Sequence, residues 1–475
     1  MQEKAIYPYS EWELIEEQFT EEHNFRNETM FMTGNGYIGF RGTLEEGYSG
    51  PKGIGEEGTY LNGFYESGAI EYPERLYGYA DNNDFMLNVT NSKIIKLFID
   101  GEPFDMLQGQ CSGYSRVLSL KNGTLTRKLT WTSPHGKTVS IHIERLTSFT
   151  DRHIAAIRYE VTPVNFDGEI KLISALDGSV TNQAGFVSFL VGSEPKRERY
   201  LTTERIQASD GAGAILQKTK RSGLALSCAM KNTLETSCPS SCQSSAEDSF
   251  LSAAYTVRAA RGQSIVLCKY IAYATSRDFA EEQLFDAAKD LAAKAAQAGF
   301  ARLRNDQIAY LKRFWDRADI VIKGDPALQQ GIRVDMFHVL QSSGRDGKSA
   351  IGAKGRPPRA SAATISGTPR CSSSPSSSTT LRPSPASCWN TSTTRWTRPA
   401  RARASLPIRR ARAIRGGRCP VRNARPTSRR APRSIMSTPT LRLPSSSTWT
   451  RRTTRTSWSI TARRSSSRRP ASGPT

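Results

Sequence analysis

Apolar and polar side chains alternate in short runs over roughly the first 270 residues. The run Thr138–Glu144 alternates strictly, which is typical of a half-buried antiparallel strand. Lys93–Asp100 ends at Asp100-Gly101, and the run that begins at Val117 ends at Asn122-Gly123; both dipeptides favour a tight hairpin turn. Many such runs, with a turn signal about every ten residues, predict a large antiparallel β-sandwich.

The spacing of apolar residues becomes helical near Asp278. Asp278 and Glu281 have the spacing of a capping box, in which the Asp side chain accepts a hydrogen bond from a free backbone N–H at the start of a helix. Apolar residues then recur at Leu284, Ala288, Leu291 and Ala295. Gly299 is expected to end this helix, and further helices are predicted from Leu303 to Trp315 and from Ala327 to Gln341. A β region thus precedes a helical one.

The composition changes abruptly after Lys354. The 475-residue chain has 66 Lys and Arg against 44 Asp and Glu. Residues 355–475 hold 26 of the Arg residues and contain no Asp, Glu, Lys, His, Gln, Phe or Tyr. The front of the chain is therefore slightly acidic, and the excess of positive charge lies in this tail. Because few large apolar groups remain there to offset the entropy of ordering, the tail is predicted to be disordered.

An arginine-rich segment can also be a nucleic-acid-binding arm. Two features argue against that function here: Lys is wholly absent, and the tail has four Trp residues but no Phe or Tyr. This bias is typical of a coding sequence read in the wrong frame. We therefore expect no specific nucleic-acid partner, although the 26 guanidinium groups would attract any phosphate polymer in a salt-dependent way.

Several other classes of protein are not indicated. The start, Met1–Pro8, has no apolar stretch typical of a secretory signal, and no run approaches the ~18 apolar residues of a membrane-spanning helix. Eight Cys residues are too few for a disulfide scaffold and suit a cytoplasmic location. Cys238 and Cys242 form a C-x3-C pair without a second pair or a nearby His, which favours free thiols over a zinc site.

Seven segments carry the densest motifs of the front. They are Thr33–Gly42 (TGNGYIGFRG), Gly58–Glu66 (GTYLNGFYE), Asn88–Asn91 (NVTN), Arg145–Phe149 (RLTSF), Phe314–Ile320 (FWDRADI), Gln329–Gln341 (QQGIRVDMFHVLQ) and Ile351–Gly355 (IGAKG). In this order and spacing they resemble glycoside hydrolase family 65, the maltose, trehalose and kojibiose phosphorylases. The resemblance covers residues 8–355.

The resemblance implies a multidomain α+β architecture. Residues 1–272 are expected to form an antiparallel β super-sandwich, and 273–322 a helical linker. Residues 323–354 are expected to be the first helix of a truncated (α/α)6 catalytic barrel, and 355–475 a disordered Arg/Ser/Pro-rich tail that is out of frame.

The resemblance also implies an activity. Family phosphorylases cleave an α-glucosidic disaccharide such as maltose with inorganic phosphate as co-substrate and without a cofactor. The configuration at the anomeric carbon is inverted, so the products are β-glucose 1-phosphate and glucose. For the intact enzyme we expect a homodimer, and we expect no membrane partner. Two alternatives stay open: an α-glucoside hydrolase like the acid trehalases of the family, and a non-catalytic carbohydrate-binding or structural β-sandwich.

The catalytic motifs of the family are missing from the frame as written. Family members carry His-x-Phe-Trp-Asp-Thr-Glu shortly after Ala-Lys-Gly, but here Ala353-Lys354-Gly355 leads to Arg356. Read two bases later with suitable synonymous codons, Ala363–Arg370 can spell that motif, and Trp449–Trp458 can spell a segment with a Glu where the family has its general acid. We therefore assign no catalytic, substrate-binding or metal-binding residue and predict an inactive chain.

Three groups in the front look catalytic but are expected to be structural. Glu56 and Glu57 resemble a carboxylate pair, yet they lie among Gly residues in a predicted sandwich loop, where solvated or interface roles are favoured. His338 lies on a predicted helix, where a packed, hydrogen-bonded His is more common than a substrate contact. Asp316 and Asp319, near a helix end, are expected to cap the helix or to form salt bridges.

Overall fold

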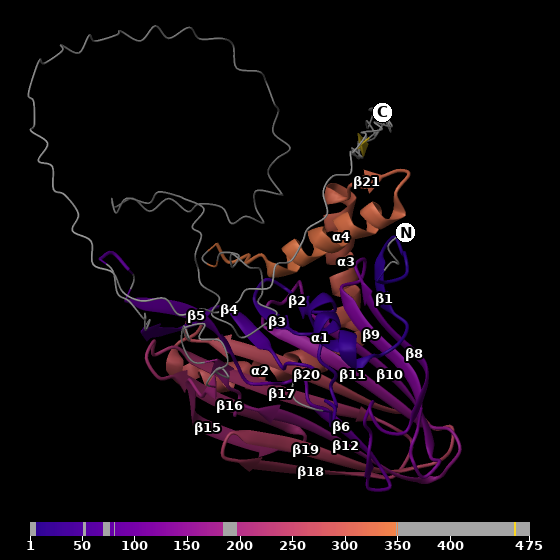
Figure 1. Ribbon diagram of the computed structural model, residues 1–475. Helices are drawn as coiled ribbons and strands as arrows, with labels where there is room; N and C mark the ends of the chain where they lie inside the picture. Colours follow the sequence, from indigo (N-terminus) through magenta and orange to yellow (C-terminus); the bar gives the residue numbers. More distant parts are fainter. Residues whose placement is uncertain are drawn as a thin grey trace, which may run out of the picture. The chain divides into compact units, whose positions relative to one another are not determined.

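The structure is a computed structural model that describes residues 6–50, 54–69, 77–79, 81–183, 197–347 and 349, together with 460–461. Two antiparallel β-sheets dominate it (Figure 1). The strands of the larger sheet are, in spatial order, β1 (Glu13–Glu16), β8 (Gln110–Ser119), β9 (Thr124–Thr132), β10 (Thr138–Thr147), β11 (Ile154–Pro163), β20 (Ile265–Thr275), β17 (Ala225–Glu235), β16 (Ala212–Thr219) and β15 (Leu201–Ser209). The strands of the smaller sheet are β18 (Ser240–Glu247), β19 (Phe250–Ala259), β12 (Gly168–Asp177), β6 (Ile95–Ile99) and β7 (Glu102–Pro103).

Three small sheets complete the strands. A four-stranded sheet has the order β2 (Thr33–Gly34), β3 (Ile38–Phe40), β4 (Thr59–Ala69) and β5 (Asn82–Asn88). The two-stranded sheets pair β13 (Asn182–Gln183) with β14 (Arg197–Glu198), and β21 (Val321–Ile322) with β22 (Ile460–Thr461).

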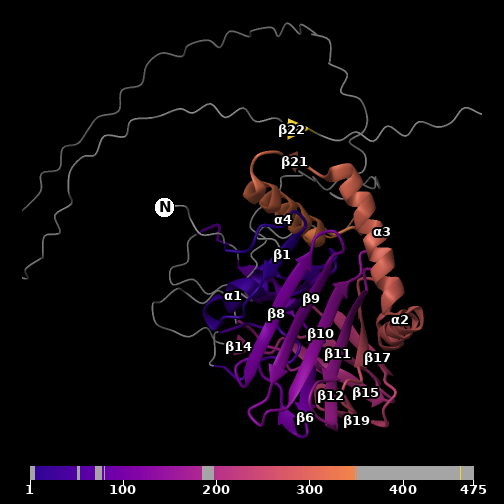
Figure 2. The same ribbon diagram turned by 90° about the vertical axis from the view of Figure 1, so that its right-hand side faces the viewer.

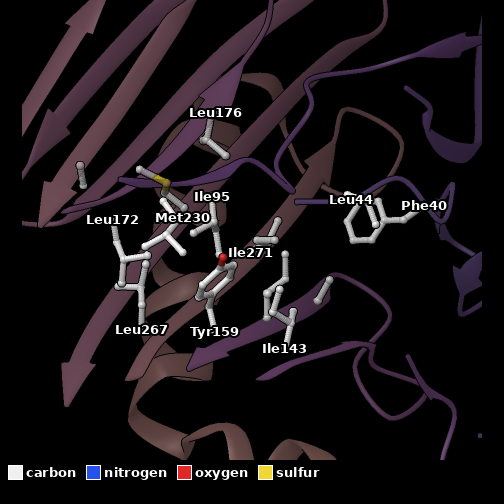
Figure 3. Packing of buried hydrophobic residues seen from close by; sticks show 14 of the residues in the cluster. Phe40, Leu44, Ile95, Ile143, Tyr159, Leu172, Leu176, Met230, Leu267 and Ile271 are labelled. Carbon is white, nitrogen blue, oxygen red and sulfur yellow. The ribbon is translucent and has the colours of Figure 1, made fainter. Parts of the chain in front are cut away.

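The main hydrophobic core lies between the two large sheets. Every second side chain along a strand faces this core, because successive side chains of a strand point to opposite faces of the sheet. Figure 3 shows Leu172 on β12 next to Met230 on β17 and Leu267 on β20, so side chains of both sheets interdigitate. The predicted antiparallel β-sandwich is confirmed, and so are the hairpin turns, where Asp100, Gly101 and Gly123 all have positive φ.

The helices are α1 (Glu21–Met30), the 3-10 turn η1 (Glu281–Gln283), α2 (Leu284–Ala298), α3 (Phe300–Ala318) and α4 (Pro326–Ser342). Helix α2 packs its apolar side chains on the outer face of the nine-stranded sheet, mainly against β17 and β20. Gly299 separates α2 from α3 with φ of 80°, as predicted. Figure 2 shows α3 continuing from α2 toward α4. Among the described residues, no helix is long and apolar enough to cross a membrane.

Two sequence predictions about helices are wrong. Helix α1 lies in the region predicted to be strands only; its buried residues are Asn24, Asn27 and Glu28, so it has no apolar stripe to reveal it. Asp278 does not cap a helix: Ala280 precedes η1 without a side-chain cap, and Asp278 Oδ1 instead binds Arg152 Nη2 at 2.7 Å.

The structure describes little of the arginine-rich tail. Only Ile460 and Thr461, which form β22, are described after residue 349. The chain divides into two compact units, and the second, Thr393–Trp458, lies outside the described residues. The predicted disorder of 355–475 and its out-of-frame origin therefore remain predictions.

Candidate functional site

Three arginine side chains point into the interior from neighbouring strands of the nine-stranded sheet. Arg116 on β8 lies opposite Arg127 on β9, and Arg145 is on the next strand, β10. All three are almost fully buried, at inward positions where alternation favours apolar residues. Because a buried charge is very costly without a partner, the fold requires carboxylates beside them.

The first carboxylate comes from the edge strand β1. Glu16 Oε2 lies 3.4 Å from Arg116 Nη1 and accepts a hydrogen bond from Tyr114 OH at 3.0 Å. Arg116 Nη2 also donates to the carbonyl oxygen of Gly42. These contacts fix the segment after β3 against the large sheet.

Two further carboxylates come from that segment. Glu45 lies 3.2 Å from Arg127 Nη2 and 3.1 Å from Arg145 Nη1. Glu46 also pairs with Arg127, and its Oε1 accepts a hydrogen bond from Tyr159 OH at 2.6 Å. One acidic dipeptide thus compensates two arginines on different strands.

Helix α1 contributes a fourth carboxylate. Glu28 Oε2 accepts hydrogen bonds from Arg41 Nη2 at 3.0 Å and from the backbone N–H of Glu56 at 2.9 Å. Its Oε1 accepts from Tyr48 OH and, at 3.4 Å, from Asn24 Nδ2. The contacts with Arg41, Tyr48 and Glu56 join α1 to the loop between β3 and β4, which explains why a helix with a polar buried face is stable here.

Glu56 and Glu57 both form ion pairs, as expected for structural groups. Glu57 Oε1 pairs with the buried Lys93, and its Oε2 accepts a hydrogen bond from Thr43 Oγ1 at 3.0 Å. Glu56 Oε1 lies 2.9 Å from Arg197 Nη2 at the surface. The two carboxylates therefore have separate cations and do not act as a pair.

Together these groups form a buried ion network of matched charge. Burial alone raises the pKa of the Glu45 carboxyl, but Arg145 and Arg127 outweigh it and hold that pKa below its usual value. Burial lowers the pKa of Lys93 despite the neighbouring Glu57. A general acid needs the opposite, a carboxyl kept protonated near neutral pH. The network, which we interpret as structural, consists of Glu16, Glu28, Glu45, Glu46 and Glu57 with Arg41, Lys93, Arg116, Arg127 and Arg145.

The glycine-rich motif Thr33–Gly42 connects the β-sandwich to helix α4. The backbone N–H of Gly36 donates to the carbonyl oxygen of Gln341 at 2.8 Å, and Asn62 Nδ2 donates to the carbonyl oxygen of Gly36 at 3.0 Å. Gly36 has φ of 87°, and a Cβ there would lie 2.0 Å from the carbonyl oxygen of Ser343. Only glycine fits this approach.

His338 lies on α4 and is packed, as expected. Its Nδ1 is 2.9 Å from Gln341 Nε2, and Nε2 is buried without a hydrogen-bond partner among the described residues. Burial lowers the pKa of His338 to about 4. The imidazole is therefore uncharged at neutral pH, and the imidazolium form that could act as a general acid is absent.

The two aspartates at the end of α3 also have structural positions. Asp319 is the C-cap residue of α3 and binds Arg333 of α4 through both oxygens, at 2.9 Å from Nε and 2.9 Å from Nη2. Asp316 is exposed. This side-on pair joins α3 to α4 and confirms the predicted salt bridge for Asp319.

Cys238 and Cys242 are free thiols in the structure. Cys238 is buried and donates to Gln263 Oε1 at 2.7 Å, whereas Cys242 is exposed. The part of the chain that the structure describes holds no group of three or more His, Cys, Asp or Glu side chains suited to a metal ion.

A model of one protein family matches the part of the chain that holds these features. It is described as the N-terminal domain of glycosyl hydrolase family 65, and it matches residues 14–314. The chain belongs to glycosyl hydrolase family 65. The motifs at residues 33–42, 58–66 and 145–149, which indicated the family, all lie within this match.

Curated relatives in this family include named phosphorylases. The chain is 45% identical over 352 residues to an α,α-trehalose phosphorylase of Thermoanaerobacter brockii, covering 74% of this chain and 45% of that protein. It is 30% identical over 355 residues to a maltose phosphorylase of Bacillus subtilis, with the same coverage of 74% and 45%. This member of family 65 spans less than half the length of these relatives.

A solved structure supports the fold. It is that of a putative kojibiose phosphorylase from the human microbiome, with a TM-score of 0.65 at 23% sequence identity. The match covers 73% of this chain and 44% of that one. It shows that the β-sandwich and the first helices of this family 65 chain follow the architecture expected from the motifs.

Proposed function

We propose that this chain derives from an inverting phosphorylase of α-glucosidic disaccharides, maltose-like in substrate, and that the chain as written is inactive. The observation that supports the reaction class is the 45% identity to a trehalose phosphorylase over 352 residues. The proposed ligands are a disaccharide and inorganic phosphate. We also propose a cytoplasmic location and, for an intact enzyme, a homodimer.

The reaction transfers a glucosyl group to phosphate. A carboxylic acid donates its proton to the glycosidic oxygen while a phosphate oxygen attacks the anomeric carbon from the opposite face. The bond from carbon 1 to the glycosidic oxygen breaks, and a bond from carbon 1 to phosphate forms with inversion. An α-glucoside therefore yields β-glucose 1-phosphate and free glucose.

The described residues would support this chemistry without performing it. Their buried carboxylates are paired with Arg and Lys, and Gly36 and Arg333 anchor the start of the helical part. In our proposal the general acid is a Glu that the other reading frame encodes across the codons for Thr454 and Arg455. The β-sandwich serves as the scaffold on which the barrel begins.

The first test concerns the frame itself. Sequencing the source DNA across the codons for Ala350 to Pro358 shows whether a base was gained or lost. The purified chain is then assayed with maltose, trehalose and kojibiose plus phosphate, beside a gene whose frame is restored after Lys354. We expect glucose 1-phosphate from the restored protein only; release by the chain as written would contradict the proposed inactivity.

The assay also separates the alternatives. A hydrolase would release glucose without phosphate and form no glucose 1-phosphate. A restored protein that lacks both activities yet retains a saccharide would be a binding module instead. Trehalose preferred to maltose would correct the proposed substrate while leaving the reaction class intact.

A further inference from the structure

The outer face of the nine-stranded sheet differs between its two halves. Under α2 it carries small apolar side chains such as Ala156, Ala229 and Ala272. Over β8, β9 and β10 the same face carries Ser, Thr, Lys, His and Glu side chains. Figure 2 shows these strands side by side with no helix in front of them. The polar half is therefore available to a ligand.

Two adjoining hollows lie on this polar half and share Lys128 and His142. Each has a volume of about 350 Å³, which is within the range of small-molecule sites. Glu13 on β1 and Arg304 on α3 line the first hollow. We call the two hollows together the polar groove.

The charged groups around the polar groove already neutralise one another. Arg304 Nε lies 2.6 Å from Glu144 Oε1, and Arg158 Nη1 lies 2.8 Å from Glu160 Oε2. Burial lowers the pKa of His142, so its ring is neutral at neutral pH. An ionic ligand or a nucleic acid would find little net charge here, and a lipid would find little apolar surface.

Hydroxyl groups are what the polar groove offers most. Across the paired strands they come from Ser115, Ser119, Thr126, Thr130 and Ser140. Lys128, exposed between the hollows, adds an ammonium group with three N–H donors. Hydroxyls both donate and accept, and the hydroxyls of a sugar do the same, so the two surfaces are complementary.

We propose that the polar groove binds a neutral saccharide chain through hydrogen bonds from these hydroxyls and from Lys128. The described residues that line either hollow include no Phe, Tyr or Trp side chain on which a sugar ring could stack. Binding is therefore weak and carried by hydrogen bonds. The proposal rests on described residues of β1, β8 to β11 and α3, and its failure would leave the proposed phosphorolysis untouched.

Titration of the soluble full chain with maltotetraose tests the proposal by calorimetry. This probe is uncharged, so the arginine-rich tail does not attract it. Saturable binding is expected, and Lys128→Gln and Thr126→Val should each weaken it about fivefold, as loss of one or two hydrogen bonds predicts. The matched control is Lys171→Gln, which changes a partly exposed lysine on β12 of the other sheet.

Hydrogen exchange with and without maltotetraose locates the site. Protection confined to amides of β8, β9 and β10 supports the proposal. No saturable binding would overturn it and leave an ordinary solvated sheet face. Saccharide binding that is unchanged in Lys128→Gln and Thr126→Val would also overturn it. A dimer in sedimentation that these substitutions dissociate would overturn it too, because the polar groove would then bind a second copy of the chain.

Discussion

At the scale of single residues, Lys269 on β20 is a buried lysine without a carboxylate beside it among the described residues. Its Nζ donates to the carbonyl oxygens of Ala175 at 2.7 Å and Ile94 at 3.1 Å. Burial lowers the pKa of this ammonium to about 7 from its usual 10.5. The core thus holds a group that releases its proton far more readily in the folded state than in the unfolded one.

We expect Lys269→Met to change how stability depends on pH. Between about pH 7 and pH 10.5 the unfolded chain binds one more proton at this site than the folded chain, so wild-type stability rises with pH there. At about 1.4 kcal/mol for each unit of pKa difference, wild type should gain a few kcal/mol relative to the variant across this window. Urea unfolding at several pH values measures this. A parallel pH dependence in both proteins would contradict the pKa, and Lys171→Met on the outer surface should match wild type.

A second residue-scale prediction concerns the buried ion network. Glu28→Gln keeps the shape of the side chain but removes the negative charge that pairs with the buried Arg41. Breaking a buried pair in this way costs about 3 kcal/mol. Glu21→Gln on the same helix, which is exposed, is the control and should stay within about 0.5 kcal/mol of wild type. Equal stability of both variants in urea unfolding would show that the network is not needed.

The buried arginines show what the sequence reveals at this scale and what it hides. In β10 the inward positions are Ile141, Ile143 and Arg145, so a charged residue stands where the alternation requires an apolar one. That exception indicates an interior ion pair. The sequence could not identify the partner, because Glu45 lies 100 positions away along the chain and only the folded sheet brings it close.

At the scale of secondary-structure elements, the contact between the Gly36 turn and the end of α4 is a specific weak point. Gly36→Ala places a methyl group against the carbonyl oxygen of Ser343 in a left-handed backbone conformation. We expect α4 amides to exchange faster with solvent by about tenfold or more, since the helix end must move away, while β10 and β11 stay protected. Gly331→Ala, inside α4 with open space around its Cβ, is the control and should slow exchange. Unchanged exchange in Gly36→Ala would contradict the contact.

Elements were predictable where local pattern determines them. Strict alternation and Asp-Gly or Asn-Gly turns located β6, β8, β9 and β10, and the break at Gly299 separated α2 from α3. Helix α1 was not predicted because its buried face is made of Asn and Glu side chains, whose partners lie in the β3–β4 loop and, for Asn27, on β1. The order of strands, such as β11 beside β20, depends on pairing between segments about a hundred residues apart, and no local pattern specifies that.

At the scale of the whole molecule, helix α4 exposes two large apolar side chains. Leu328 and Val339 on α4 are 47% and 50% exposed. In the proposed origin of this chain, the rest of a barrel would cover these side chains, and large exposed apolar patches favour association. We therefore expect the expressed chain to aggregate, and Val339→Glu together with Leu328→Lys to raise the monodisperse soluble fraction severalfold in size-exclusion chromatography.

The control for this prediction is a substitution of the same kind on the β-sandwich. Val164 follows β11, is 41% exposed, and donates its backbone N–H to Thr138 of β10, so Val164→Glu changes the β-sandwich and should leave aggregation unchanged. If it improved solubility as much as the α4 substitutions, net charge and not the exposed α4 side chains would be the cause. A wild-type chain that is soluble, monodisperse and of full mass would show that α4 needs no further cover, and would weaken the case that a catalytic barrel was lost from this protein.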